Sequence, residues 1–322
     1  MISYSVVVRT LGKAGGLYQK MLDSLNKQTY KPSNIYVFIA EGYEIPKETI
    51  GYEEYFYVKK GMVAQRALPY NEVKTEYILF LDDDVYLPEK AVEDLYNRMM
   101  SLGADVIAPD TFPNYKRNRK TKLKMALIGK SYARKSDGWA YKALRNGGYS
   151  YNEDPVEKTC LSQLNAGPCF FCSKEVFLSI HFEEELWLDS SPYALPEDQV
   201  MFYKFYKYGY KILTAFDTGI IHLDAGSANK TSSIKEHNVI YSESKNKLIY
   251  WHRFFFVPES GLILSRLMNV LSIAATYIVR YALLICKFKF REARSWIKGI
   301  RHAIEFINST EYKKLPIIPS IM

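Results

Sequence analysis

The chain has 322 residues, of which 48% are hydrophobic and 24% are charged, a composition that indicates a globular protein and excludes a disordered one. Four cysteines exclude a disulfide scaffold and indicate a reducing compartment, and residues 1–10 do not have the pattern of a secretory signal. The net charge of +8 comes without zinc-finger spacing or an aromatic RNA-binding strand, so we expect no nucleic-acid partner.

The first third of the chain alternates between two kinds of pattern. Apolar, β-branched runs predict buried strands, whereas leucine and methionine at helical spacing predict helices. The runs predict strands at 3–8, 35–40, 77–81 and 105–108, and helices at 17–25, 61–73 and 88–100. This alternation predicts an α/β fold with a mostly parallel central sheet flanked by helices.

Polar side chains follow three of the predicted strands. Thr10 comes after the first strand, Glu41 after the second and Asp82–Asp84 after the third. Ligands of parallel sheets bind beyond the carboxyl ends of the strands, so these residues predict a binding site at that edge.

The acidic triplet Asp82–Asp84 needs a cation. Adjacent carboxylates repel each other, and Mg²⁺ or Mn²⁺ prefers oxygen ligands. A divalent metal that bridges a diphosphate would offset the charge. The alternative is an exposed acidic turn before the next helix.

Residues 116–145 hold eleven Lys or Arg and one acid, Asp137. The simplest interpretation is a solvated face. The alternative is a surface that meets phosphates or anionic lipid headgroups.

A second acidic pair, Glu197-Asp198, opens a segment with helical spacing. An acid at a helix N-terminus can serve the cap and the helix dipole. It can also act as a general base toward an attacking hydroxyl, and the sequence leaves both alternatives open.

The last third has two amphipathic patterns. In residues 261–290, Arg266 and Arg280 lie on one side of a helix with Ser265, Asn269 and Thr276, while Leu267, Leu271 and Ile278 lie opposite. Residues 291–307 set isoleucines and Trp296 against Arg291, Arg294, Lys298 and Arg301. The two patterns predict an in-plane membrane anchor. The alternatives are two helices packed on the rest of the chain, or a membrane-spanning helix that tolerates Arg266 and Arg280.

Taken in order, several segments resemble the family 2 glycosyltransferases, which have the GT-A (Rossmann-like) fold. The matching pieces lie within residues 3–225 and are SVVVRT at 5–10, SLNKQTYKP at 24–32, AQR at 64–66, YILFLDDD at 77–84, NAGPCFFCSKEVF at 165–177 and LPEDQVMFYKFYKYGYK at 195–211. The resemblance implies a catalytic domain over 1–235, with a nucleotide-binding half at 1–110 and an acceptor half at 111–235. Residues 236–322 would form a helical, membrane-associating extension.

The resemblance also implies roles for single residues. Thr10, Glu41, Arg66, Asp82 and Asp83 would bind the nucleotide sugar. Asp84, Asp82 and His222 would hold Mn²⁺ or Mg²⁺. Asp198 would be the catalytic base, with Glu197 as the other candidate.

The implied activity is inverting, metal-dependent transfer of a sugar from a nucleotide sugar to a hydroxyl of a glycan or a polyprenyl-diphosphate-linked acceptor. The implied setting is bacterial surface-polysaccharide synthesis, in the cytoplasm on the inner face of the membrane. A membrane-peripheral sugar-nucleotide-binding protein without activity and a nucleotidyltransferase are the alternatives.

Overall fold

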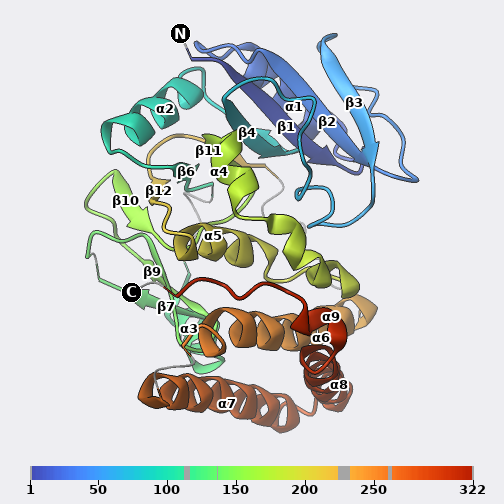
Figure 1. Ribbon diagram of the computed structural model, residues 1–322, viewed down its shortest axis with the longest axis vertical. Helices are drawn as coiled ribbons and strands as arrows, with labels where there is room; N and C mark the ends of the chain where they lie inside the picture. The colour runs from blue at the N-terminus through green and yellow to red at the C-terminus, as the bar shows by residue number, and fades with distance from the viewer. Residues whose placement is uncertain (1, 112–116, 136, 224–232, 260–262, 321–322) are drawn as a thin grey trace.

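The computed structural model describes residues 2–111, 117–135, 137–223, 233–259 and 263–320. Its N-terminal part contains the four predicted strands and two of the three predicted helices in order, together with two strands that were not predicted, Glu53–Val58 and Val85–Tyr86 (Figure 1). The elements are β1 (Tyr4–Thr10), α1 (Gly16–Asn26), β2 (Asn34–Ala40), β3 (Glu53–Val58), β4 (Tyr77–Asp82), β5 (Val85–Tyr86), α2 (Ala91–Ser101) and β6 (Val106–Pro109).

One predicted helix is wrong. Residues 61–73 form a chain of turns: Ala67 N–H donates to Val63 O at 2.7 Å as in a helix, but the next bond runs from Leu68 to Arg66 O. Pro69 follows directly and cannot donate a backbone hydrogen bond, so the helical turn does not extend. The apolar residues of this segment still pack in the core, because Val63, Tyr70 and Val73 are all buried.

The middle of the chain completes the main sheet and adds two small ones. Its elements are α3 (Arg119–Leu127), β7 (Ser131–Arg134), β8 (Tyr141–Ala143), β9 (Tyr149–Asn152), β10 (Thr159–Ser162), β11 (Cys169–Ser173), α4 (Lys174–Ser179), a 3₁₀ helix (Phe182–Ser190), α5 (Glu197–Lys207), β12 (Ile212–Ala215) and β13 (Ile221–His222). The small sheets are β7-β9-β8 and β13-β5.

The main sheet has eight strands in the order β10-β12-β6-β11-β4-β1-β2-β3. It is mixed: β1, β2, β3 and β4 pair in parallel, as do β12 and β6, whereas β10 and β11 run antiparallel to their neighbours. Side chains alternate between its faces. Val6 and Val8 pack with α1 and α2 in one core, and Val7 packs in the other core with residues of α4 and α5.

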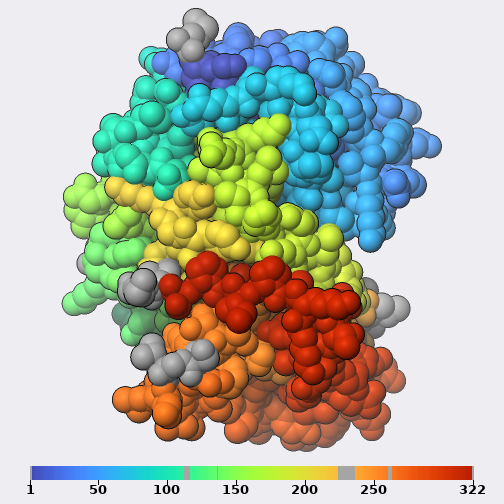
Figure 2. Space-filling view, in the orientation of Figure 1, coloured from blue at the N-terminus to red at the C-terminus, as the bar shows by residue number. Residues whose placement is uncertain are grey.

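The C-terminal third forms a helical layer at the end of the molecule opposite β1–β3 (Figure 1). It contains α6 (Ser233–Trp251), a π-helical turn (His252–Phe256), α7 (Ile263–Cys286), α8 (Phe290–Ile307) and α9 (Thr310–Lys313). The tail after α9, red in Figure 2, crosses the face between this layer and α5. There Arg253 donates to Pro316 O at 2.7 Å.

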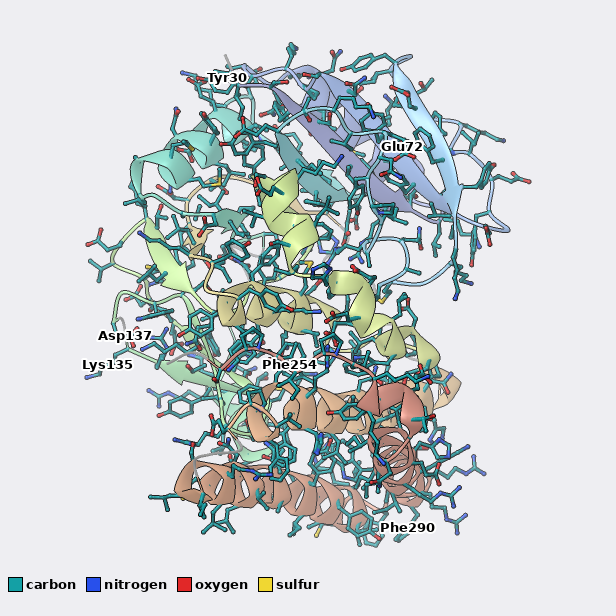
Figure 3. The ribbon with its side chains drawn as sticks, viewed as in Figure 1. Tyr30, Glu72, Lys135, Asp137, Phe254 and Phe290 are labelled. Carbon is teal, nitrogen blue, oxygen red and sulfur yellow. The ribbon has the colours of Figure 1, made fainter. Side chains whose placement is uncertain are left out.

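A buried ion cluster joins this layer to the rest of the molecule. Glu185 of the 3₁₀ helix, which is fully buried, lies 2.9 Å from Lys204 of α5 and 3.0 Å from Arg253 of the π-helical turn. Phe254, labelled in Figure 3, packs beside it in the common core. The helical layer and the sheet layer are therefore one packed body rather than two separate folding units.

Helix α7 faces the protein with a mixed side that includes its polar residues and also Ile273, Tyr277 and Leu284. Asn269 and Thr276 are buried, whereas Leu267, Leu271 and Ile278 are 52%, 55% and 67% exposed. The predicted division into two faces is therefore present, and the apolar face lies outward. By length and composition alone, α7 is also the one helix among the described residues that could cross a membrane.

Candidate active site

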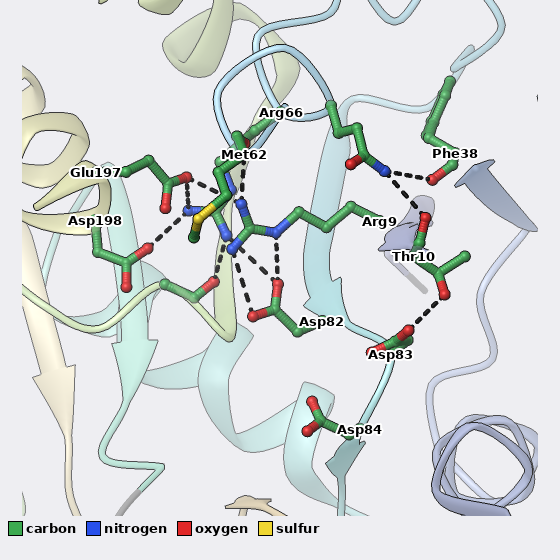
Figure 4. Close-up of polar contacts among 12 residues, drawn as sticks. Arg9, Thr10, Phe38, Met62, Arg66, Asp82, Asp83, Asp84, Glu197 and Asp198 are labelled. Atoms are coloured by element: carbon green, nitrogen blue, oxygen red, sulfur yellow. Dashed lines mark hydrogen bonds and ion pairs between the residues drawn. The ribbon is translucent and has the colours of Figure 1, made fainter. Parts of the chain in front are cut away.

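The centre of the site is built where β1 and β4 end side by side. In the parallel register Arg9 is paired with Asp82, so both side chains point to the same face. The Arg9 guanidinium donates to both carboxylate oxygens of Asp82, at 2.7 and 3.4 Å (Figure 4). Asp82 is thus an arginine partner, and its oxygens face away from Asp84.

Arg66 links this strand edge to helix α5. It is 3% exposed and lies in the turns after β3, where Asp189 accepts hydrogen bonds from the backbone N–H groups of Val63 and Ala64. Its guanidinium lies 2.8 Å from Glu197 and 2.9 Å from Asp198.

The same guanidinium reaches back to the strands. It lies 3.5 Å from Asp82 and donates to Gly167 O at 2.9 Å. Arg66 therefore touches both acidic motifs that the sequence separates by more than a hundred residues (Figure 4).

Glu197 and Asp198 open α5, and their side chains, which both contact Arg66, differ in exposure. The Glu197 carboxyl is 2% exposed and also accepts from Arg9 at 3.0 Å, whereas the Asp198 carboxyl is 35% exposed. The outward, accessible acid is Asp198. Between the two candidates for a base, the geometry therefore favours Asp198.

The pKa values separate in the same direction. Burial raises the pKa of Glu197 to about 7, against the pull of Arg66 and Arg9. Burial also opposes the charge of Asp198, but Arg66 and then Arg9 outweigh it and hold the pKa of Asp198 below its usual range. Two guanidiniums face three carboxyls here, so a proton on Glu197 balances the cluster and leaves Asp198 ionised.

Gly167 makes room for this contact. A Cβ built there would lie 2.0 Å from Asp198 Oδ1 and 2.6 Å from Arg66 Nη1. The Gly167 backbone N–H also bonds Asp198 and helps to keep it ionised. No other residue type leaves the Arg66–Asp198 pair intact.

Asp198 faces a cavity of about 190 Å³. Its walls come from the 61–66 turns, the β8–β9 turn, the start of α5 and the middle of α6. They comprise Met62, Lys130, Gly147, Gly148, Ala194, Leu195, Pro196, Glu197, Asp198, Gln199, Glu243 and Lys247.

The predicted nucleotide residues lie on the other side of Asp82. Thr10 donates a very short hydrogen bond to Asp83 and accepts one from Gly12 N–H at 2.8 Å. Burial raises the pKa of Asp83 to about 6, and Thr10 counteracts this only in part. Glu41 lies at the end of β2 with an exposed side chain.

Asp84 and His222 are brought together by the pairing of β5 with β13, in which His222 lies opposite Val85. Asp84 Oδ1 and His222 Nε2 are 2.9 Å apart. Two neighbouring ligands of an octahedral ion at about 2.0–2.1 Å are separated by about that distance. In the described part of the chain no three His, Cys, Asp or Glu side chains converge on one metal position, so phosphate oxygens would have to complete the coordination.

Several site residues are absent from the sequence-based set. Arg9 is the chief one, and its signal is a charged residue at the end of an otherwise apolar strand. Gly167, Lys130, Glu243 and Lys247 have no local signal, because only the folded chain brings them to the cavity.

Part of the chain matches a known protein family. Residues 56–177 match the family model described as Glycosyl transferase family 2, a range that includes Arg66, the acidic triplet and Gly167. The matched range is about two fifths of the chain. A match of this kind indicates glycosyl transfer, and it specifies neither the donor nor the acceptor.

One solved structure is similar in outline, the crystal structure of GalNAc-T7 with UDP, GalNAc and Mn²⁺. The two chains are 15% identical with a TM-score of 0.47, over 82% of this chain and 53% of that one. The match thus spans about half of the length of that protein. No curated protein matches the sequence.

Proposed function

We propose that the protein transfers a sugar from a nucleotide-sugar donor to an acceptor hydroxyl, with inversion at the anomeric carbon. The observation that carries the proposal is Asp198, an ionised and partly exposed carboxylate at a cavity, fixed by the arginine that also holds the strand-end acid Asp82. A base must be charged, reachable and fixed, and Asp198 meets all three conditions.

In the proposed reaction Asp198 takes the proton of the acceptor hydroxyl, while the oxygen of that hydroxyl attacks the anomeric carbon. The bond from that carbon to the diphosphate oxygen breaks, and its electron pair leaves with the diphosphate. Glu197 stays buried and keeps Arg9 and Arg66 in place. Thr10, Glu41 and Asp83 would line the nucleotide.

The donor side requires a cation. Asp84 and His222 would hold Mn²⁺ or Mg²⁺, which would offset the charge of the departing diphosphate. Histidine ligates a metal only in its neutral form, so acid would weaken metal binding at this pair.

The test is an assay of transfer and donor hydrolysis with a panel of nucleotide sugars and Mn²⁺. Asp198→Asn should retain donor binding and lose at least a hundredfold in rate, which is the scale of general-base catalysis. Asp84→Ala should lose Mn²⁺-dependent donor binding. Asp23→Asn, on the exposed side of α1, is the control and should behave as the parent. Full transfer by Asp198→Asn would contradict the proposal.

We also propose that α7 and α8 lie on the inner face of a bacterial cell membrane, where the acceptor of surface-polysaccharide synthesis would be lipid-linked. The support is the outward apolar face of α7 together with a groove of about 490 Å³ between the two helices. Tyr281 and Phe290 line the groove with Arg294, Lys298 and Arg301, and such a basic rim over apolar surface suits anionic headgroups.

Co-sedimentation with phosphatidylglycerol-containing vesicles tests this placement. The triple change Leu267→Ser, Leu271→Ser and Ile278→Ser should weaken binding at least tenfold. A control at the far end of the molecule, Tyr52→Ser with Tyr57→Ser, removes exposed side chains of β3 and its approach and should leave binding unchanged. Protein that resists extraction at high pH would indicate a spanning helix instead.

A further inference from the structure

The cavity that Asp198 lines also has basic residues in its wall. Lys130 and Lys247 line it together with the acid Glu243. Arg280 stands behind Glu243, with 3.6 Å between their charged atoms, and Lys130 lies 3.8 Å from the same carboxylate. Lys130, Lys247 and Arg280 therefore share the Glu243 carboxylate. The distances from Glu243 to Lys130 and to Arg280 are both longer than a hydrogen bond.

The donors of this cluster are incompletely used. The Lys247 ammonium donates to Gly129 O at 2.9 Å, and the side chain is almost fully buried. Arg280 Nε is buried without a hydrogen-bond partner among the described residues. Burial, and after it Lys130 and Arg280, lower the pKa of Lys247 to about 8 although Glu243 opposes this. Three cations around one carboxylate leave an excess of positive charge, which favours a bound anion.

The backbone around the cluster packs closely at two glycines. At Gly148 a Cβ would lie 2.4 Å from Gly129 O, and at Gly129 it would lie 2.3 Å from Asn146 Nδ2. The turn that contains Gly147 and Gly148 is tied to α7, because Asn146 donates to Thr276 Oγ1 at 2.8 Å. The basic end of the cavity thus lies against the inner side of the helix whose outer side is the apolar surface.

We propose that the Lys130–Lys247 end of the cavity binds a phosphoryl group of the acceptor, while the acceptor hydroxyl faces Asp198 at the other end. This inference rests on the proposed function and adds the chemical class of the acceptor to it. Two sources share the chemistry: the phosphate of a prenyl-type lipid and the phosphate of a soluble sugar phosphate. The position of α7 favours the lipid.

The first test is binding of inorganic pyrophosphate, measured by calorimetry with EDTA on the full chain carrying Asp84→Ala, so that no metal-held diphosphate contributes. Binding should persist in this background and weaken at least tenfold on adding Lys130→Ser or Lys247→Met. Lys158→Ser, which alters a lysine 79% exposed elsewhere on the surface, is the matched control and should bind as the background does.

Lys130 is half-exposed, so its variant should fold even if the change at the buried Lys247 disturbs the core. Absence of binding in the Asp84→Ala background, or binding unaffected by either lysine change, would overturn the inference. Because this readout needs neither donor nor transfer, it can fail while the assay of Asp198→Asn succeeds, and the reverse.

The second test separates the two sources. Geranyl diphosphate, a short prenyl diphosphate, should bind at least tenfold more tightly than pyrophosphate if a lipid carries the phosphate, and Lys130→Ser should weaken both. Equal affinities that still depend on Lys130 would support the anion site with a soluble sugar phosphate as its ligand. Tighter binding of the prenyl compound that is independent of Lys130 would count against the site.

Discussion

Helices α5 and α7 both have side chains at helical spacing, but they differ in which kind of side chain they bury. Helix α5 buries Val200, Phe202 and Phe205 and leaves Asp198 at a cavity. Helix α7 buries Asn269 and turns Leu267 and Leu271 outward. The repeat of a helical sequence shows that there are two faces, and only the partners in the fold decide which one is inside.

The difference has an energetic meaning. Apolar surface left in water forgoes about 25 cal/mol for each Å² that could be covered. A helix whose apolar face is exposed while its polar face is hydrogen-bonded inside is stable only because those inner contacts offset that loss. The outward apolar face of α7 becomes favourable where the apolar interior of a membrane covers it.

The largest expected effect is on the α5 side of this comparison. Phe205→Ala removes a fully buried ring from the aromatic cluster and should cost about 3–5 kcal/mol of unfolding free energy. Leu271→Ala on α7 should change the unfolding free energy by no more than about 0.5 kcal/mol, because the side chain is largely exposed. Urea denaturation of the lipid-free protein measures both, and equal losses would remove the contrast between the helices.

A smaller effect is expected from the polar face of α7. Asn269 donates to Phe255 O at 3.0 Å and to Glu259 at 2.8 Å, and it accepts from Arg145 at 2.9 Å. Asn269→Leu makes the helix more hydrophobic yet leaves these partners unpaired, so it should destabilise the protein by about 1–3 kcal/mol.

The matched change on the outer face is Leu267→Asn, which should be nearly neutral in the absence of lipid. Denaturation of the two variants side by side measures the asymmetry. Stabilisation by Asn269→Leu would show that the polar face is not held by its hydrogen bonds.

The sequence was informative where local pattern and chemistry coincide. Strands β1, β2, β4 and β6 follow from apolar runs, and Asp82–Asp84 follows from its place at a strand end. Strand β3 was missed because Glu53–Val58 begins with two acids and is not fully buried. Residues 61–73 were misjudged because apolar spacing was weighed above Pro69, which ends the turn. The mixed direction of β10 and β11 depends on pairings between distant segments, which periodicity does not encode.

The acidic residues of the site were predictable from the sequence, and the arginines and lysines were less so. Arg66 and Asp198 were predicted as members of one site, and the structure places them 2.9 Å apart. Arg9 was assigned only to its strand. The lysines of the cavity wall come from a loop and from α6, and their convergence depends on how the helical layer packs, which local sequence does not report.

The fixed position of Gly167 has a practical consequence for anyone who would redirect the enzyme. With no space for even one more carbon there, saturation libraries at this position should yield only inactive clones, whatever acceptor is screened. Ala194 and Gln199 line the same cavity, and Met62 contacts Arg9 only through its backbone oxygen, so diversity is best introduced at these three side chains. Variation at those three positions would reshape the chamber and leave its proton-accepting corner intact.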